Sequence, residues 1–114
     1  PELVVRRLVH VLGYRYVLHD ARLPGTPDLV FPARRKVIFV HGCFWHGHRC
    51  SRGFRPTSNA QYWAAKIERN RQRDREANRA LRRLGWDVLV VFECALKPHR
   101  LPILLTRLVG FLDG

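Results

Sequence analysis

The stretch DLVFPARRKVIFVH, residues 28–41, decides the fold of this 114-residue chain. It holds two short runs of β-branched and aromatic residues, 28–31 and 36–41, on either side of a proline-containing segment, 32–35. Runs of this composition separated by turn-forming residues are typical of two strands joined in a hairpin. The sequence therefore predicts a β-hairpin in this region.

Elements on both sides of the hairpin follow from the spacing of apolar residues. Helices are predicted over residues 2–12, 59–84 and 102–112, and Gly13 and Gly85 mark the ends of the first two. Further strands are predicted over residues 14–18 and 86–92, and the second is a continuous apolar run expected to be buried on both faces. The order αβββαβα predicts an α/β fold, a single-domain sandwich over residues 1–114 with a central mixed sheet.

The long predicted helix, 59–84, carries an apolar stripe that polar residues interrupt. The stripe consists of Trp63, Ile67, Ala77, Leu81 and Leu84. Asn70 and Asp74 share its face, which the fold is expected to bury. Polar groups on a buried face need partners, so we expect a site, a ligand or the sheet edge beside them.

The charge of the chain points to nucleic acid as its partner. Lys and Arg number 21 against 9 Asp and Glu, which gives a net charge of +12. Such an excess is expected where a protein binds the phosphates of a polyanion. The alternative is that 18 Arg against 3 Lys reflects a GC-rich genome and a charge that serves solubility.

Cysteine usage and the chain's beginning bear on its cellular context. Three cysteines are an odd number, and neither a signal peptide nor a run of about 18 apolar residues is present. We expect a cytoplasmic protein with reduced thiols and no membrane partner. Because the chain begins at Pro1 without methionine, we also expect a short N-terminal segment to precede it.

Residues 42–58 lack periodicity and contain several candidate zinc ligands. The candidates are Cys43, His46, His48 and Cys50, together with Cys94 after the last predicted strand. A structural zinc takes four nitrogen or sulfur ligands, and three thiolates with one histidine is a common set. The spacing does not decide which histidine is the fourth ligand. The alternative is that the cysteines are small buried apolar residues.

Asp28 is a candidate ligand for a second, harder cation. The hairpin is expected to bring it close to Val40 and His41. One carboxylate, a main-chain carbonyl and water can hold magnesium, which polarises a phosphodiester during hydrolysis. The alternative is that an aspartate at a strand start only caps a turn.

Four separated motifs resemble the very-short-patch repair (Vsr) endonuclease family. They are HGCFWHGHRC (41–50), PGTPDLVF (24–31), YWAAKIERNRQRD (62–74) and LGWDVLVVFECAL (84–96). The resemblance spans about residues 2–96. It implies a restriction-endonuclease-like fold, similar to the PD-(D/E)xK nucleases, with histidines in place of the usual downstream acid and lysine. It also implies a magnesium-dependent endonuclease that nicks one DNA strand beside a T:G mismatch.

The resemblance assigns catalytic roles residue by residue. Asp28 and the main-chain carbonyl of Val40 are the implied magnesium ligands, and His41 is expected to hold a water molecule at the metal. His46 is the implied general base or water-orienting group. Glu2 takes the place of an acid that faces the same site from the first helix.

The resemblance also separates the zinc ligands from the catalytic histidines. The implied zinc ligands are Cys43, His48, Cys50 and Cys94. This assignment leaves His41 and His46 free for catalysis. The zinc is then structural and lies directly behind the catalytic loop.

Contacts with DNA are implied for the loop aromatics and for the long helix. The implied DNA-binding residues are Phe44, Trp45 and Trp63, which intercalate, Lys66 and Asn70, which touch the mismatched bases, and Arg71, which with Arg69, Arg73 and Arg75 tracks phosphates. Wedging an aromatic ring between base pairs costs a few kcal/mol, and the cost is least at a mismatch. The alternatives are core packing for Trp63 and a solvated helix face for the arginines.

The sequence departs from the family pattern at two positions. Val40 stands where many members have a hydroxyl residue, and Gly47 stands where a histidine is common. Neither change removes an assigned side-chain ligand or base. The expected N-terminal segment matters more, since in the family it closes over the DNA and helps to read the mismatch.

The expected partner is double-stranded DNA carrying a T:G mismatch, bound by a monomer at the nucleoid, with other mismatch-repair proteins as further candidate partners. One alternative is a related restriction or homing nuclease that cuts matched DNA. Another is a zinc-bound DNA-binding module without catalysis. Asp28, His41 and His46 together argue against this second alternative.

Overall fold

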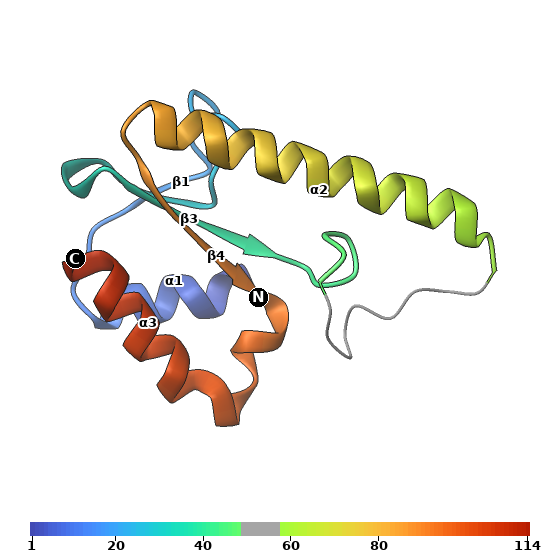
Figure 1. Ribbon diagram of the computed structural model, residues 1–114. Helices are drawn as coiled ribbons and strands as arrows, with labels where there is room; N and C mark the ends of the chain where they lie inside the picture. Colours follow the sequence, from blue (N-terminus) through green and yellow to red (C-terminus); the bar gives the residue numbers. More distant parts are fainter. Residues whose placement is uncertain (49–57) are drawn as a thin grey trace.

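The computed structural model describes residues 1–48 and 58–114, and Figure 1 shows the path of the chain. The helices are α1 (Glu2–Val11), α2 (Ala60–Arg83) and α3 (Leu101–Asp113). The strands are β1 (Val17–Leu18), β2 (Leu29–Phe31), β3 (Lys36–His41) and β4 (Asp87–Phe92). Short 3-10 helices are η1 (Pro32–Arg34), η3 (Glu93–Leu96) and η4 (Pro98–Arg100). The predicted order of helices and strands is confirmed.

The strands form one mixed sheet with the order β1-β2-β3-β4. The predicted hairpin is the antiparallel pair β2 and β3, in register at Leu29 and Ile38. The connection from β3 through α2 to β4 is a crossover, and β3 and β4 are accordingly parallel, with Val40 opposite Val91. The end of β3 therefore lies beside the end of β4.

Helices cover both faces of the sheet, as an α/β sandwich requires. Figure 1 shows α1 and α3 on one face and α2 on the other. Val9 of α1 and Leu108 of α3 pack with Ile38 in one fully buried cluster. Leu81 of α2 packs with Val37 in a second cluster on the opposite face. The alternation of side chains along β3 thus supplies both cores.

Helix α2 is longer than the sheet is wide, and its first half overhangs the end of β3 (Figure 1). It ends where predicted, because Gly85 has a φ of 88° and its N–H donates to the carbonyl of Arg82 at 3.0 Å. No helix in the described ranges is both long and apolar enough to cross a membrane.

Three details of the prediction are wrong. Residues 86–92 are not buried on both faces, because β4 is an edge strand in which only Val91 is buried. The strands that are buried throughout or almost throughout are β2 and β3. Leu84 lies outside the apolar stripe with 54% of its surface exposed, because it follows the last helical residue. Strand β1 has two residues and begins later than predicted.

The segment before β2 passes close beneath α2, and a glycine makes this possible. A Cβ atom on Gly25 would lie 2.7 Å from the Cβ of Ala77, and the glycine φ of 75° is in the left-handed region. Any side chain there would push α2 away from the sheet. The close approach fixes the position of Asp28, three residues later.

Candidate active site

Asp28 lies beside the end of β3, as predicted. It directly precedes β2, and the antiparallel pairing with β3 carries its carboxylate to Val40. The main-chain N–H of Val40 donates to Oδ2 of Asp28 at 2.7 Å. Burial raises the pKa of the Asp28 carboxyl; the Val40 hydrogen bond opposes this shift and the neighbouring Glu2 carboxylate reinforces it. A half-buried carboxylate of this kind is favourable for binding a cation.

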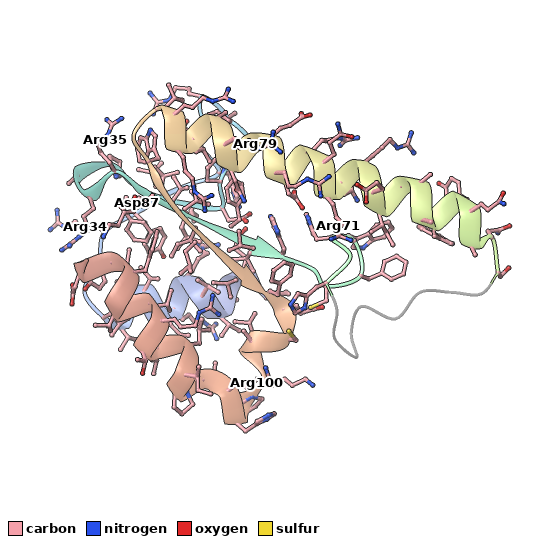
Figure 2. All side chains as sticks on the ribbon, in the orientation of Figure 1. Arg34, Arg35, Arg71, Arg79, Asp87 and Arg100 are labelled. Carbon is pink, nitrogen blue, oxygen red and sulfur yellow. The ribbon has the colours of Figure 1, made fainter. Side chains whose placement is uncertain are left out.

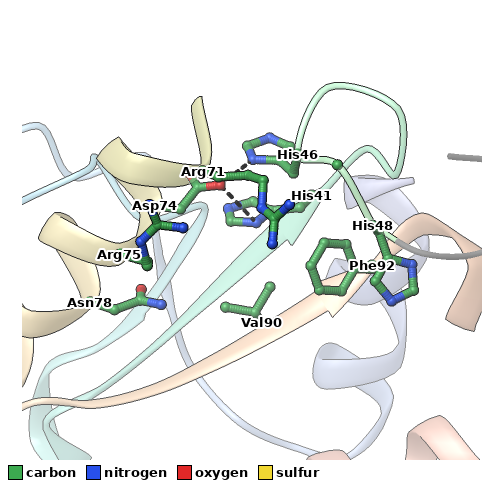
Figure 3. Close-up of a pocket in the computed structure, with 10 residues that line it drawn as sticks. His41, His46, His48, Arg71, Asp74, Arg75, Asn78, Val90 and Phe92 are labelled. Atoms are coloured by element: carbon green, nitrogen blue, oxygen red, sulfur yellow. Dashed lines mark hydrogen bonds and ion pairs between the residues drawn. The ribbon is translucent and has the colours of Figure 1, made fainter. Parts of the chain in front are cut away.

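His41, His46 and Asp74 form a second cluster at the same end of β3 (Figure 3). Nδ1 of His46 lies 2.5 Å from Oδ2 of Asp74, and Nδ1 of His41 lies 3.9 Å from the same oxygen. The two imidazole rings stack with centroids 3.8 Å apart and an interplanar angle of 3°. His46 is therefore the partner of Asp74, one of the two polar residues on the apolar face of the long helix that were expected to need one.

The imidazole of His41 is held in its neutral form. Its side chain is buried at the last position of β3. Burial lowers the pKa of His41 to about 4, the charge of His46 lowers it further and the charge of Asp74 opposes the shift. At neutral pH the ring therefore offers one N–H donor and one acceptor nitrogen.

The clusters open onto two pockets lined with basic residues. A pocket of about 550 Å³ is lined by His41, His46 and Asp74 together with Arg71 and Arg75. A second pocket, of about 300 Å³, is also lined by His41, His46 and Asp74. It extends to Asp28, Val40 and Arg73. Figure 2 shows Arg71 and Arg79 along α2. The arginines can place a phosphate beside the histidines and the carboxylates.

Glu2, His19 and Asp28 form a third cluster. Glu2 and Asp28 were predicted to lie at one site, and His19 was not. Nε2 of His19 lies 2.7 Å from Oε1 of Glu2 and 3.9 Å from Oδ1 of Asp28. Partial burial acts to raise the pKa of Glu2, but hydrogen bonds with His19 and Asp28 and the charges of His19 and Arg6 lower it overall. The prediction that Glu2 faces the Asp28 site agrees with this geometry.

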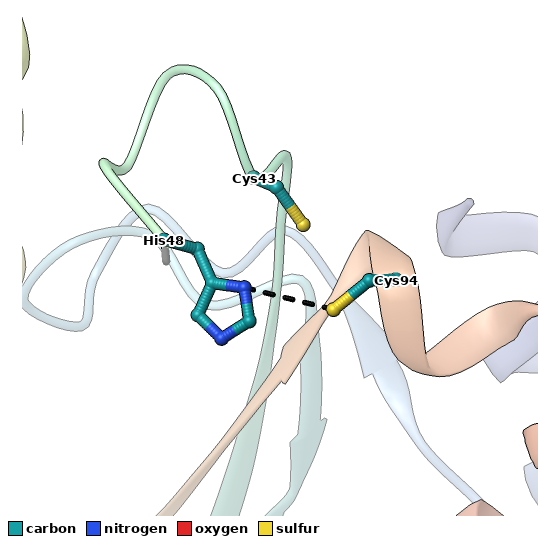
Figure 4. Close-up of side chains that lie close together, drawn as sticks. All are labelled: Cys43, His48 and Cys94. Atoms are coloured by element: carbon teal, nitrogen blue, oxygen red, sulfur yellow. Dashed lines mark hydrogen bonds between the residues drawn. The ribbon is translucent and has the colours of Figure 1, made fainter. Parts of the chain in front are cut away.

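Three of the four predicted zinc ligands lie together (Figure 4). Ligand atoms of Cys43, His48 and Cys94 all lie within 4.8 Å of one another. Sγ of Cys94 is 3.6 Å from Nδ1 of His48, and both cysteines are buried. Cys50, the fourth predicted ligand, lies outside the described residues. His46 is in the other histidine cluster, which is the division that spacing alone left open.

The predicted intercalating residues, Phe44, Trp45 and Trp63, form one aromatic cluster between the loop after β3 and the start of α2. Ring centroids lie 5.1 Å apart for Phe44 and Trp45, and 5.6 Å apart for Trp45 and Trp63. Tyr62, which was not predicted, stacks edge-on against Trp63 at 5.1 Å. Nζ of Lys66 lies 5.4 Å from the centre of the Trp45 ring, within range of a cation–π contact.

Trp63 lies outside both hydrophobic clusters of the described core, and this argues against a core-packing role. Asn70 has a structural contact in addition to its predicted one with the bases. Its Nδ2 donates to the main-chain carbonyl of Trp45 at 2.9 Å, so it holds the aromatic loop against α2. Arg75 pairs with Glu68 at 3.1 Å on the same helix, and both are well exposed.

His19 and Tyr62 are the site residues that the sequence did not reveal. His19 follows a predicted strand and has no metal-ligand spacing to Glu2 or Asp28. Only the pairing of β1 with β2 brings it there, through a hydrogen bond from its N–H to the carbonyl of Asp28 at 3.1 Å. For Tyr62, an exposed aromatic residue next to Trp63 was an available signal.

The chain is similar in sequence to several known proteins. The sequence model of a family described as DNA mismatch endonuclease Vsr matches residues 1–52. The chain is 54% identical over 113 residues to the type II nicking enzyme V.XorIIP of Xanthomonas oryzae pv. oryzae, covering 99% of this chain and 82% of that protein. It is 43% identical over 97 residues to the type II nicking enzyme V.NmeAIP of Neisseria meningitidis, covering 85% and 69%. It is 44% identical over 97 residues to the DNA mismatch endonuclease Vsr of Escherichia coli, covering 82% and 62%.

Proposed function

The chain belongs to the DNA mismatch endonuclease Vsr family, and from that premise we propose that it is a magnesium-dependent endonuclease that nicks one DNA strand beside a T:G mismatch. The observation that carries this proposal is that Asp28, a half-buried carboxylate, and the His46–Asp74 pair line one pocket at the end of β3. A phosphodiester hydrolase needs a cation site and a general base that can act on the same phosphate. The proposal includes that the α/β sandwich is a fold of the restriction-endonuclease type.

The residues around Asp28 fit a hard cation. Asp28 and Glu2 both present carboxylate oxygens, and the pocket beside Asp28 also reaches Val40, whose main-chain carbonyl is the further proposed ligand. Bound magnesium polarises the phosphoryl oxygen and stabilises the charge that develops there. Arg73 lines the same pocket and is placed to hold the phosphate.

His46 is the proposed general base, and Asp74 is its positioning residue. The Asp74 carboxylate accepts a hydrogen bond from Nδ1 of His46, which leaves Nε2 as the nitrogen with a free lone pair. A water molecule at Nε2 can then lose its proton as it attacks the phosphate. His41, neutral and stacked on His46, is proposed to orient that water.

A structural zinc is proposed for the cysteine cluster. Two buried thiols and an imidazole nitrogen form a soft donor set that suits zinc, and Cys50 is the proposed fourth ligand. Zinc supplies a cross-link between the loop after β3 and the end of β4. The loop between Cys43 and His48 contains His46, Phe44 and Trp45. The proposed cross-link would therefore hold the general base in place.

Mismatch recognition is proposed for the aromatic cluster. Trp45 is 44% exposed although it lies among other rings, and Phe44 and Trp63 support it from behind. A rigid, exposed ring in a basic surface is suited to entering a base-pair step, and a displaced T:G pair is weakly stacked. Lys66 lies beside the same ring, where it can contact the DNA groove.

The named relatives are bacterial, and we place the proposed activity in the bacterial cytoplasm.

A second candidate function is sequence-specific nicking of matched DNA. The relative that is 54% identical over nearly the whole chain is named a type II nicking enzyme. The catalytic chemistry is the same in both cases. The candidates differ only in whether a mismatch is needed.

The proposed catalytic site is tested by nicking a labelled T:G duplex in magnesium. We expect Asp28→Asn and His46→Ala to abolish nicking, because the first removes the cation's anchor and the second removes the base. DNA affinity should stay within about threefold, since a carboxylate makes few phosphate contacts. Asp87→Asn, an exposed aspartate at the start of β4, is the matched control and should nick at the parent rate. Parent-like nicking by Asp28→Asn or His46→Ala overturns the assignment.

A further inference from the structure

Three ligand-bearing side chains from separate parts of the chain converge beside the proposed catalytic metal. Glu2 comes from the start of α1, His19 from the turn after β1, and Asp28 from the residue before β2. One ligand atom of each lies within 4.8 Å of the others. The inference that follows rests on the proposed function, because Asp28 is the same carboxylate that is proposed to hold magnesium.

The backbone aims the imidazole of His19 at both carboxylates. The His19 N–H donates to the carbonyl of Asp28 at 3.1 Å, which ties the two residues together beyond the paired ends of β1 and β2. The φ of His19 is 48°, in the left-handed region that few residues other than glycine adopt. With this backbone, Nε2 faces Oε1 of Glu2 at 2.7 Å and Oδ1 of Asp28 at 3.9 Å.

These separations suit ligands of one cation. Metal–ligand bonds of about 2.1 Å place neighbouring ligand atoms of an octahedral site roughly 3 Å apart and opposite ones roughly 4 Å apart. The distances from Nε2 of His19 to Oε1 of Glu2, 2.7 Å, and to Oδ1 of Asp28, 3.9 Å, lie close to those values. A divalent cation also offsets the repulsion between Glu2 and Asp28, which contributes to the raised pKa of Asp28.

We propose that His19 is a ligand of the catalytic metal site and makes it a mixed nitrogen–oxygen site that binds Mn²⁺ more tightly than Mg²⁺. Magnesium takes oxygen ligands and keeps several waters, so it gains little from an imidazole. First-row transition metals accept imidazole nitrogen readily, and Mn²⁺ also accepts the two carboxylates. The preference therefore depends on His19, while Asp28 anchors either ion.

A hydrogen bond without metal binding is the competing role for His19. Its side chain is 52% exposed, and an exposed ion pair with Glu2 contributes little to stability. Such a pair predicts no dependence of metal affinity on His19. The two roles therefore separate in a metal-binding measurement on the free protein.

The experiment titrates Mn²⁺ into the purified zinc-loaded protein without DNA, with electron paramagnetic resonance as the readout. The free Mn²⁺ signal gives the dissociation constant, competition with Mg²⁺ gives the selectivity, and pulsed spectra detect a nitrogen ligand. We test His19→Asn, because asparagine tolerates the left-handed backbone and is too short to reach the carboxylates. The matched control is His10→Asn, an exposed histidine near the end of α1.

We expect the parent protein to bind Mn²⁺ at least about tenfold more tightly than Mg²⁺ and to show nitrogen coupling. His19→Asn should lose about tenfold in Mn²⁺ affinity and lose the nitrogen coupling, with Mg²⁺ affinity changed less than about threefold. His10→Asn should match the parent. Unchanged Mn²⁺ affinity in His19→Asn, or nitrogen coupling that persists there, overturns the inference.

The outcomes distinguish this inference from the proposed function. If the parent nicks DNA in Mg²⁺ but its Mn²⁺ binding is independent of His19, the inference fails and the proposed function stands. If Mn²⁺ binds through His19 but no duplex is nicked in either metal, the metal site stands and the proposed function fails.

Discussion

At the scale of single residues, Asp74 shows how a polar group on an otherwise apolar helix face can serve the site, because it contacts His46. Its carboxylate accepts a hydrogen bond from Nδ1 of His46 and lies near the same atom of His41. The carboxylate therefore fixes which nitrogen of His46 carries the proton, and it holds the ring at the end of β3. We therefore propose that Asp74 acts through His46 and not through contact with DNA.

Asp74→Asn is expected to lower kcat for nicking by about 10²- to 10⁴-fold, because an amide no longer selects one imidazole tautomer. KM and DNA affinity should change little, since the proposed role of Asp74 is to position His46 and not to bind the substrate. Single-turnover nicking over a range of DNA concentrations separates the two constants. Glu76→Gln, two residues away on the exposed face, is the control. A loss expressed in KM alone contradicts a positioning role.

The site residues that the sequence could predict are those that carry recognisable motifs. Asp28, His41 and Cys43 lie in or next to the hairpin, where local spacing and a family resemblance both apply. His19 could not be predicted, because its place depends on how two short strands pair. The separate roles of His46 and His48 depend on packing against α2 and β4, and spacing contains no information on either.

At the scale of elements, the loop after β3 is held from two sides. Asn70 of α2 binds the carbonyl of Trp45, and the cysteine cluster joins the loop to the end of β4. Because Phe44 and Trp45 of this loop pack against Trp63 and not into either described core cluster, these cross-links contribute to the shape of the loop. The proposed zinc is therefore a condition for the base and the aromatic residues to be in place.

One tightly bound zinc per chain is expected, and Cys94→Ala should lose it together with several degrees of melting temperature. His48→Ala should behave in the same way, whereas His46→Ala should keep its zinc and lose only nicking. Elemental analysis and thermal unfolding of the three variants test this division. Zinc retained in Cys94→Ala, with an unchanged melting temperature, excludes the proposed ligand set.

A buried lysine ties β3 to the end of α3. Nζ of Lys36 donates to the carbonyl oxygen of Phe111 and, at 3.4 Å, to that of Leu112. The last carbonyls of a helix lack helical partners and carry partial negative charge, so a cation there is stabilising. Lys36 is 6% exposed, and the burial of its charge depends on these contacts.

Lys36→Met should lower the free energy of unfolding by about 1 to 3 kcal/mol, because it removes the donor to the Phe111 carbonyl, whereas Arg34 still donates to the Leu112 carbonyl at 2.8 Å. Nicking at a permissive temperature should be unchanged, since the site lies at the other end of β3. Urea unfolding measures the effect. Arg82→Met, at an exposed position of α2, should stay within about 0.5 kcal/mol of the parent. Equal values for the two variants would contradict the helix-capping role.

Most elements could be predicted because each helix and strand has the apolar period of its type. The burial of β4 could not, since a continuous apolar run does not reveal whether its strand is central or at an edge. The position of Leu84 failed for a related reason. The apolar period in the sequence continues to Leu84, although the helix ends at Arg83.

At the scale of the whole molecule, the α/β sandwich brings the proposed base and the proposed cation site together at the end of β3, beside arginines of α2. The net charge of +12 favours binding to any duplex, so charge cannot supply selectivity. Selectivity is assigned to the exposed Trp45 ring and its neighbours, which lie beyond the end of β3. Binding and discrimination thus belong to different parts of the surface.

The central claim is tested most directly by nicking two duplexes that differ only in a T:G or a T:A pair, side by side at fixed salt in magnesium. The account predicts nicking of the T:G duplex at least about tenfold faster, because ring insertion costs less at a displaced pair and a single good base contact contributes about 1 to 3 kcal/mol. Trp45→Ala should bring the ratio towards one. Equal rates on both duplexes, with the same ratio in Trp45→Ala, would contradict mismatch recognition and favour nicking of matched DNA.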